Sequence, residues 1–301
     1  MGIILCNELT VVGFLFVFVN LQQFNNLYQL ICKKHWYFLV LLIFGMKQNQ
    51  MNETLLFILL AIVGFIAGVI NTIAGGGSLL TLPMLIFMGL PPAIANGTNR
   101  IGIFIQSITS VAGFKSKGIQ PSLFSVYLGL SALIGSLIGA KIAIDIKGET
   151  FNKILAIVMV LVVLFMVFKP KVNIADFAER VQGKYRFISI ITFFIIGIYG
   201  GFIQAGVGIF ILLALSTINR ISLVSSNAVK ALVVFVYTIG ALFVFAYNNQ
   251  INYLYGFVLA FGNASGGWIA SRWSVKKGDG IVKVFLVIMV ITMAIKLWLD
   301  S

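Results

Sequence analysis

The sequence is poor in charge. Only 10% of its 301 residues are charged and 60% are hydrophobic, whereas a soluble domain typically carries about 25% charged residues. A water-soluble fold of this size cannot bury so much apolar surface in one core. The composition therefore excludes a soluble domain and a disordered chain, and it predicts an all-α, polytopic integral membrane protein.

Reactive side chains are scarce as well. Histidine occurs once, at His35, and the two cysteines, Cys6 and Cys32, frame no metal or disulfide pattern. Every carboxylate except Glu8 falls at the edge of an apolar run, so none is a clear candidate for an acid at the membrane centre. We therefore expect no catalytic residues, no metal and no cofactor, and we interpret the chain as a protein other than an enzyme.

The net charge of +13 does not indicate a nucleic-acid partner. Lys and Arg lie in short loops between apolar runs, where they orient spans in a bilayer, and they form no stripe that could follow phosphates. The lipid bilayer is thus the first partner that the sequence predicts. Self-association into a homo-oligomer is left open.

The first 50 residues differ from the rest. They hold two apolar stretches, 3–21 and 35–46, around a polar middle. One interpretation is an extra span or a signal segment, and the other is an over-extended start with Met46 or Met51 as the true first residue. We treat residues 1–50 as an N-terminal hydrophobic extension and assign no function to them.

Apolar runs of membrane length follow, and a polar link, 169–186, divides them into two groups. A membrane span needs roughly 20 such residues. The first group, in residues 51–168, has runs at 55–74, 79–90, 101–114, 123–140 and 154–168. The second, in residues 187–301, has runs at 187–205, 207–215, 231–247, 251–270 and 281–299. Residues 79–90 reach only about 18 Å as a helix, which is too short for the hydrocarbon layer.

The two groups resemble each other in the order of their small and polar residues. Gly64, Gly68 and Asn71 match Gly197, Gly201 and Gln204, then Gly75 matches Gly208 and Asn96 matches Asn227. A duplicated membrane chain with Gly-interrupted segments in corresponding places is typical of transporters. We therefore predict two homologous repeats of four to five helical elements each, with broken Gly-rich helices.

Two arrangements of the short runs predict different orientations. If each short run returns to the side it came from, most Lys and Arg residues gather on the face that holds the link; if each crosses the membrane, they divide almost evenly. Lys-rich and Arg-rich loops stay in the cytoplasm, which favours the first arrangement, with inverted repeats and a cytoplasmic link. Arg100 and Lys230 should not be counted among the loop charges if they lie within the membrane.

Several motifs of the first group resemble the sulfite exporter TauE/SafE family of membrane transporters. They are the run from Gly68 to Ser78 (GVINTIAGGGS), then Leu82-Pro83, then Gly89 to Pro92 (GLPP), then Ala95 to Asn99 (ANGTN). The resemblance covers residues 54–299, and the run from Gly197 to Gly208 fits the repeat. It implies a plasma-membrane carrier for small anions, often sulfur oxyanions or organosulfonates. The second group departs from the pattern, because it has Ala228-Val229 in place of the Gly-Thr pair and lacks the glycine triplet.

The glycine triplet before Ser78 is the strongest candidate for a binding element. Unpaired backbone groups are costly in hydrocarbon, so such a break must be buried in protein or line a cavity. The N–H groups of a half-helix that starts near Ser78 favour an anion. The alternative is that the small residues only allow close helix packing.

Polar residues among apolar ones complete the candidate site, with Arg100 and Gln106 nearby. The predicted substrate-binding residues are Asn71, Thr72, Gly75, Gly76, Gly77, Ser78, Asn96, Thr98, Asn99, Gln204, Gly206, Gly208, Asn227 and Lys230. Intramembrane polar residues are usually functional, but bonds between helices are the alternative for each. For Lys230, which lies one helical turn after Asn227, the alternative is an anchor that reaches the lipid headgroups.

These features predict a plasma-membrane transporter, an exporter or permease, for a small anion such as sulfite, a sulfonate or a related organic anion. It would work by alternating access between the two repeats. An inside-negative potential assists anion efflux by about 2.3 kcal/mol per charge per 100 mV, which favours export. The alternatives are a scaffold or sensor subunit, a membrane-embedded enzyme and a passive channel.

Overall fold

The computed structural model describes residues 53–168 and 179–273, and within 163–168 it describes the helix but not the side chains. All nine elements in these residues are α-helices. The N-terminal extension, most of the predicted link and the predicted run 281–299 lie outside the described residues. The prediction of an all-helical chain is confirmed for the part that the structure describes.

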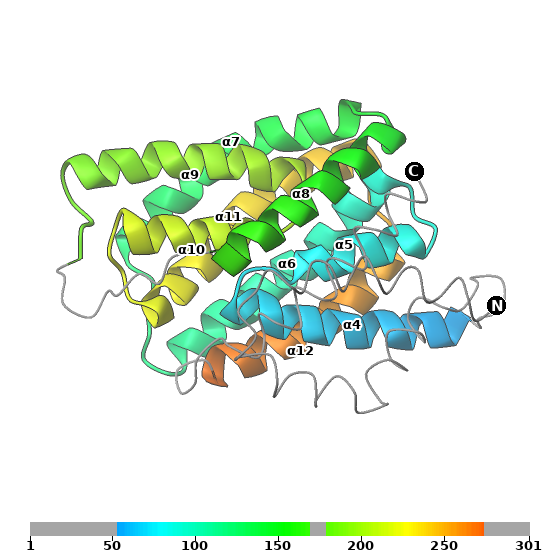
Figure 1. Cartoon of the computed structure of the whole chain (residues 1–301). Coiled ribbons are helices and arrows are strands. Elements are labelled where there is room, and N and C mark those ends of the chain that lie inside the picture. Colours follow the sequence, from blue (N-terminus) through cyan, green and yellow to red (C-terminus); the bar gives the residue numbers. More distant parts are fainter. Residues whose placement is uncertain (1–52, 169–178, 274–301) are drawn as a thin grey trace. The chain divides into compact units, whose positions relative to one another are not determined.

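The helices follow the predicted order of long and short runs (Figure 1). The helices before the link are α4 (Glu53–Ile73), α5 (Ser78–Phe87), α6 (Pro92–Lys115), α7 (Leu123–Asp145) and α8 (Gly148–Phe168). Those after it are α9 (Lys184–Phe202), α10 (Val207–Thr217), α11 (Leu223–Tyr247) and α12 (Tyr253–Trp273). Among the described helices, α4, α7, α9 and α11 are long and apolar enough to cross a membrane, whereas α5 and α10 are short apolar helices.

Two helices begin about two turns earlier than their apolar runs predict. α6 starts at Pro92, which suits the first helical position because proline has no N–H to leave unpaired. α11 starts after Ser222, whose hydroxyl caps the helix by accepting a hydrogen bond from the Ser225 N–H. The apolar runs 101–114 and 231–247 leave out these first turns because the turns are polar, and their side chains are bonded inside the protein.

The described helices pack in two groups with the same internal scheme. α12 packs against both α4 and α6, and α7 packs against both α9 and α11; α4 and α12 lie along one side of Figure 1, and α7 and α9 along the other. The groups meet where α6 packs on α11. Group A (α4, α6, α12) and group B (α7, α9, α11) therefore each contain helices from before and after the link.

Glycines set the close helix crossings inside each group. A Cβ at Gly68 on α4 would overlap the backbone carbonyl of Asn263 on α12, and a Cβ at Gly197 on α9 would overlap that of Ala132 on α7. Small residues allow membrane helices to approach this closely. For Gly64, Gly68, Gly197 and Gly201, close packing therefore accounts for the sequence pattern.

We expect Gly68→Ala to lower the melting temperature of the detergent-solubilised protein clearly. The added methyl must push α4 away from α12, and such overpacking costs about 1–3 kcal/mol. Gly148→Ala is the matched control, because a Cβ there would meet Pro92 at an ordinary 3.5 Å. Equal melting temperatures for the two variants would contradict the α4–α12 crossing.

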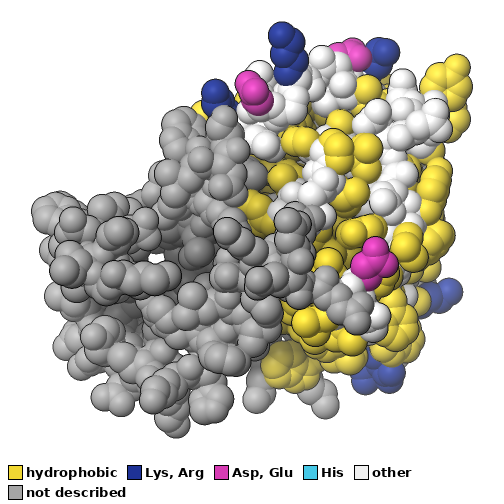
Figure 2. All heavy atoms as spheres, turned by 90° about the vertical axis from the view of Figure 1, so that its right-hand side faces the viewer, with side chains coloured by type: hydrophobic (Ala, Val, Ile, Leu, Met, Phe, Trp, Pro, Cys, Tyr) yellow, Lys and Arg dark blue, Asp and Glu magenta, His cyan; other side chains and the backbone are white. Residues whose placement is uncertain are grey.

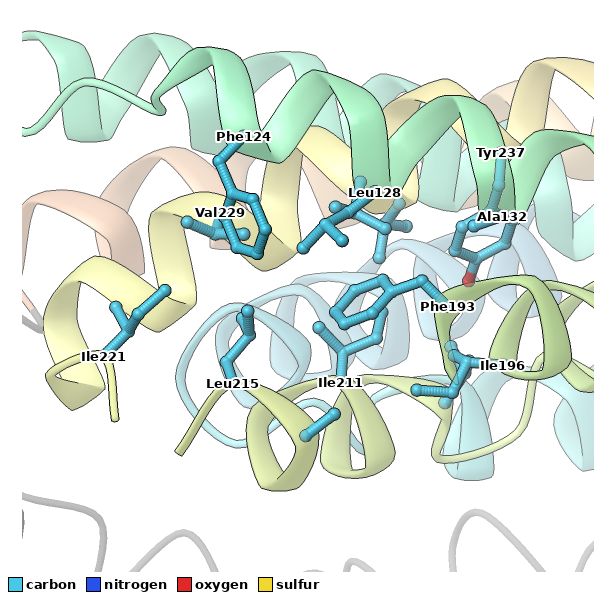
Figure 3. Packing of buried hydrophobic residues seen from close by; sticks show 14 of the residues in the cluster. Phe124, Leu128, Ala132, Phe193, Ile196, Ile211, Leu215, Ile221, Val229 and Tyr237 are labelled. Carbon is cyan, nitrogen blue, oxygen red and sulfur yellow. The ribbon is translucent and has the colours of Figure 1, made fainter. Parts of the chain in front are cut away.

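The largest described apolar core lies between α7, α9, α10 and α11. Side chains from α7, such as Phe124 and Leu128, point toward Phe193 on α9 and Ile211 on α10 (Figure 3). Tyr237 of α11 closes one end of this core and is fully buried. The core packs the short helix α10 against group B.

Many large apolar side chains of the described residues are exposed, whereas several polar ones are buried, the reverse of a soluble protein. Ile195, Phe243 and Phe261 are 60%, 68% and 75% exposed, whereas Arg100 and Asn99 are fully buried. On the described part of the face in Figure 2, a broad apolar area lies between charged side chains at the top and basic side chains near the bottom, with an acidic side chain in its lower part. Such an area matches the hydrocarbon layer of a bilayer.

Candidate functional site

The two broken helices meet. The first break lies between α4 and α5, and the second between α9 and α10. A Cβ at Gly75 would overlap the backbone of Gly208, and a Cβ at Gly208 would in turn crowd Gly75. The hydroxyl of Ser78 donates a hydrogen bond to the backbone carbonyl of Gln204 at 2.9 Å. The predicted break residues are therefore in direct contact across the two halves.

The backbone at both breaks needs unusual dihedrals. Gly75 has φ of +83°, and Gly206, which precedes α10, has φ of +70°. Gln204 has φ of +68°, which is uncommon for a residue with a side chain. Both breaks are buried from Gly75 to Ser78 and from Ile203 to Gly206. They therefore end α4 and α9 inside the protein, where their last carbonyl groups need partners.

Arg100 of α6 supplies partners to the end of α9. Its Nη1 donates to the backbone carbonyl of Gly200 at 3.0 Å and to the Oε1 of Gln204 at 2.9 Å. Its Nη2 donates to the carbonyl of Gly201 and to the Oδ1 of Asn96. The ring of Phe245 lies 4.8 Å from the guanidinium carbon. Arg100 is fully buried and binds the broken helix of the other half.

Lys230 of α11 does the same for the end of α4. Its ammonium donates to the backbone carbonyls of Asn71 at 2.8 Å and Thr72 at 2.9 Å. It also donates to the Oδ1 of Asn227, one turn earlier, at 2.6 Å. Each cation thus joins group A to group B and caps a helix that ends at a break. Because Lys230 is only 3% exposed, its ammonium does not reach the headgroups as the alternative proposed.

The charge of Arg100 meets only neutral acceptors. Its four bonds run to carbonyl and amide oxygens. Glu53, Asp145, Glu149 and Glu179, the carboxylates within the described residues, are all exposed. Burying a charge without an opposite charge is costly. Among the described residues, Arg100 therefore has no carboxylate partner in the protein interior.

Asn71 and Thr72 engage α6 through their side chains. The Nδ2 of Asn71 donates to the Oε1 of Gln106 at 3.0 Å, and Thr72 shares a hydrogen bond with Ser110 at 3.0 Å. The Nε2 of Gln106 donates to the Thr72 hydroxyl at 3.1 Å. These bonds between α4 and α6 fit the alternative that some intramembrane polar residues join helices.

Three further candidates have different surroundings. The Nδ2 of Asn96 donates to the carbonyl of Phe202 at 2.7 Å, so Asn96 also caps α9. The Oδ1 of Asn99 accepts from the Thr81 hydroxyl at 2.6 Å, whereas its buried Nδ2 has no partner. The Thr98 hydroxyl accepts from the Asn252 N–H before α12, so its bond is not to either break.

Sequence reasoning missed Tyr237. A Cβ at Gly200 would lie 3.2 Å from the Cζ of Tyr237, so the phenol packs against the residue whose carbonyl accepts from Arg100. In the sequence Tyr237 stands inside the apolar run 231–247. Its distance from the ends of that run, where interfacial tyrosines gather, is the only signal it gives.

The described helices define a polytopic helical membrane protein in which two interrupted helices meet beside buried cations. The family model described as "Sulfite exporter TauE/SafE" matches residues 60–297. The chain therefore belongs to this family of membrane transporters. The resemblance in the motifs of the first half is confirmed.

Curated relatives are also named as membrane transporters. A "Probable membrane transporter protein ORF9" of Sinorhizobium sp is 29% identical over 241 residues, which cover 80% of this chain and 92% of the relative. A "Probable membrane transporter protein YfcA" of Escherichia coli (strain K12) is 30% identical over 252 residues, which cover 83% of this chain and 93% of the relative. No solved structure matches the chain.

Proposed function

We propose that this membrane transporter carries a small anion, such as sulfite, a sulfonate or a related organic anion, across the plasma membrane. The observation that carries the proposal is the fully buried guanidinium of Arg100, which binds only neutral oxygens beside the two breaks. An entering anion would offset the cost of burying this cation. A cationic substrate would increase that cost.

The helix starts at the breaks add to this preference. α5 begins at Ser78 and α10 at Val207, and both starts are buried. The helix dipole favours negative charge at these starts, although first N–H groups such as those of Leu79 and Val207 bond to carbonyls of the preceding turn. The predicted substrate-binding residues around Gly75–Ser78 and Gly206–Gly208 thus fit an oxyanion that binds between the two starts.

Alternating access follows from how the helices are grouped. Groups A and B each pack tightly inside and meet at α6 and α11. Arg100 and Lys230 bridge the groups in opposite directions, from α6 to α9 and from α11 to α4. In this mechanism groups A and B rock against each other around the breaks. The moving bodies thus combine helices from both repeats.

The charge distribution supports an inverted arrangement with a cytoplasmic link. Because Arg100 and Lys230 are buried, both leave the count of loop charges. Lys230 had been counted on the face of the link and Arg100 on the opposite face. Removing one residue from each face leaves the excess of Lys and Arg on the face of the link unchanged. By the positive-inside rule that face is cytoplasmic, and an inside-negative potential then assists export.

Flux in proteoliposomes tests the transport proposal. We expect saturable flux of labelled sulfite or ethanesulfonate, and a reduction of roughly tenfold or more in Ser78→Ala, which loses the bond between the breaks, and in Lys230→Met. Ser265→Ala is the control, because that hydroxyl bonds to Phe261 of its own helix. Wild-type rates in both Ser78→Ala and Lys230→Met would rule out the proposed site.

A further inference from the structure

Four of the five N–H donors of Arg100 are bound, and one is not. The donors on Nη1 and Nη2 hold Gly200, Gln204, Asn96 and Gly201. The Nε has no hydrogen-bond partner, although its residue is fully buried. A buried N–H without an acceptor is costly, so its persistence calls for an explanation. The four occupied donors hold the guanidinium rigidly, with the Nε–H still available.

A second unpartnered polar group lies nearby on α11. The Tyr237 hydroxyl lies near the side chain of Gln204 but makes no hydrogen bond of normal geometry, and its residue is fully buried. Its Cζ packs against Gly200, whose carbonyl accepts from Arg100. Figure 3 shows the ring reaching away from α11 toward the helices below it, with the hydroxyl at its tip. The two unpartnered groups therefore approach the same end of α9, one from group A and the other from group B.

We propose that the Nε–H of Arg100 and the hydroxyl of Tyr237 bind one oxyanion together. This assignment rests on the proposed function and names the donors that hold its substrate. The anion would bridge α6 and α11, the two helices at which the groups meet, so its binding is linked to the relative position of the groups. Tyr237 thereby becomes a specificity-determining residue.

The donor set also defines the class of ligand. Both groups can donate, and the guanidinium cannot accept a hydrogen bond, so the ligand needs oxygen atoms that accept, as in sulfite or a sulfonate. An ammonium on the same ligand would need an acidic partner, and every carboxylate in 53–162 and 179–273 is exposed. Ethanesulfonate should therefore bind more tightly than its 2-amino derivative.

The Tyr237→Phe variant tests the assignment with the ring kept in the core. In titrations of the full-length protein in detergent, we expect the Kd for sulfite to rise about tenfold or more. The melting temperature without sulfite should change little, since the hydroxyl makes no hydrogen bond of normal geometry in the protein. Thr238→Val is the matched control, because it removes the next hydroxyl on α11, which is also buried and without a partner. Its Kd should stay within about twofold of wild type.

The outcomes separate this assignment from the transport proposal. A Kd in Tyr237→Phe equal to that of wild type overturns the assignment and leaves transport standing. An equal rise in Thr238→Val, or tighter binding of the 2-amino derivative than of ethanesulfonate, also overturns it. If the wild type neither binds sulfite or ethanesulfonate nor moves them into proteoliposomes, the proposed function fails and the assignment falls with it.

Discussion

Arg100→Met is expected to lower the free energy of unfolding by about 3–5 kcal/mol. The side chain fills a similar volume but leaves the carbonyls of Gly200 and Gly201 without their donor at the end of α9. Each buried acceptor left unpaired costs about 1–3 kcal/mol. A buried ion can be replaced by an apolar residue without loss when both partners are removed, but a backbone carbonyl stays in place.

Thermal unfolding in detergent micelles measures this loss. Arg186→Met is the control, because Arg186 is exposed on α9 and its Nε donates to the carbonyl of Val181 at the surface. We expect that variant to stay within about 0.5 kcal/mol of the wild type. A melting temperature of Arg100→Met as high as that of Arg186→Met would mean that the guanidinium does not hold α9.

Gly75→Ala is expected to prevent stable packing of the two breaks. It combines two costs: a φ of +83°, which an L residue adopts at about 1–2 kcal/mol, and overlap of its Cβ with Gly208. Overpacking adds about 1–3 kcal/mol more. Gly208 does not have a positive φ. The Gly208→Ala variant therefore has the cost of the Cβ overlap but no cost from its backbone conformation.

Gly118→Ala separates the two contributions. Gly118 has a φ of +78°, but an added Cβ meets nothing within 4 Å. We expect the order of melting temperatures to be Gly118→Ala highest and Gly75→Ala lowest, with Gly75→Ala also showing reduced monodispersity on size exclusion. If Gly75→Ala were no less stable than Gly118→Ala, the two breaks would not touch.

Sequence patterns predicted the breaks because interruption of an apolar run has a direct physical cost. The Gly75–Ser78 segment had to be buried in protein or line a cavity, and the match of Gly75 with Gly208 indicated a corresponding break in the second group. The length of the apolar runs likewise predicted the order of long and short helices. The inverted relation of the two repeats stays a prediction, although the shared packing scheme of groups A and B agrees with it.

The partners of the buried cations were beyond the reach of the sequence. Lys230 looked like a charge at a span end because it directly precedes the apolar run 231–247. Only the packing of α11 on α4 shows that its ammonium caps carbonyls. Tyr237 gave almost no signal, because an aromatic residue inside an apolar run is usually core.

Whether the predicted residues can bind substrate depends on which of their donor atoms stay unpaired in the fold, and the local sequence does not determine this. Asn99 and Arg100 are neighbours in the sequence, yet Asn99 bonds to α5 and Arg100 to α9. The Nδ2 of Asn99 and the Nε of Arg100 have no hydrogen-bond partner. That they stay unpaired depends on which acceptors the fold places within their reach. A sequence pattern can therefore nominate polar residues, but it cannot say which atoms stay available to a ligand.

Anomalous diffraction from crystals grown with selenite, a heavier analogue of sulfite, would locate an anion directly. We predict a selenium peak inside the protein between the starts of α5 and α10, with selenite oxygens at hydrogen-bonding distance from Arg100. Peaks found only beside exposed Lys and Arg side chains, in a protein that still moves sulfite, would contradict an internal anion site at the two breaks.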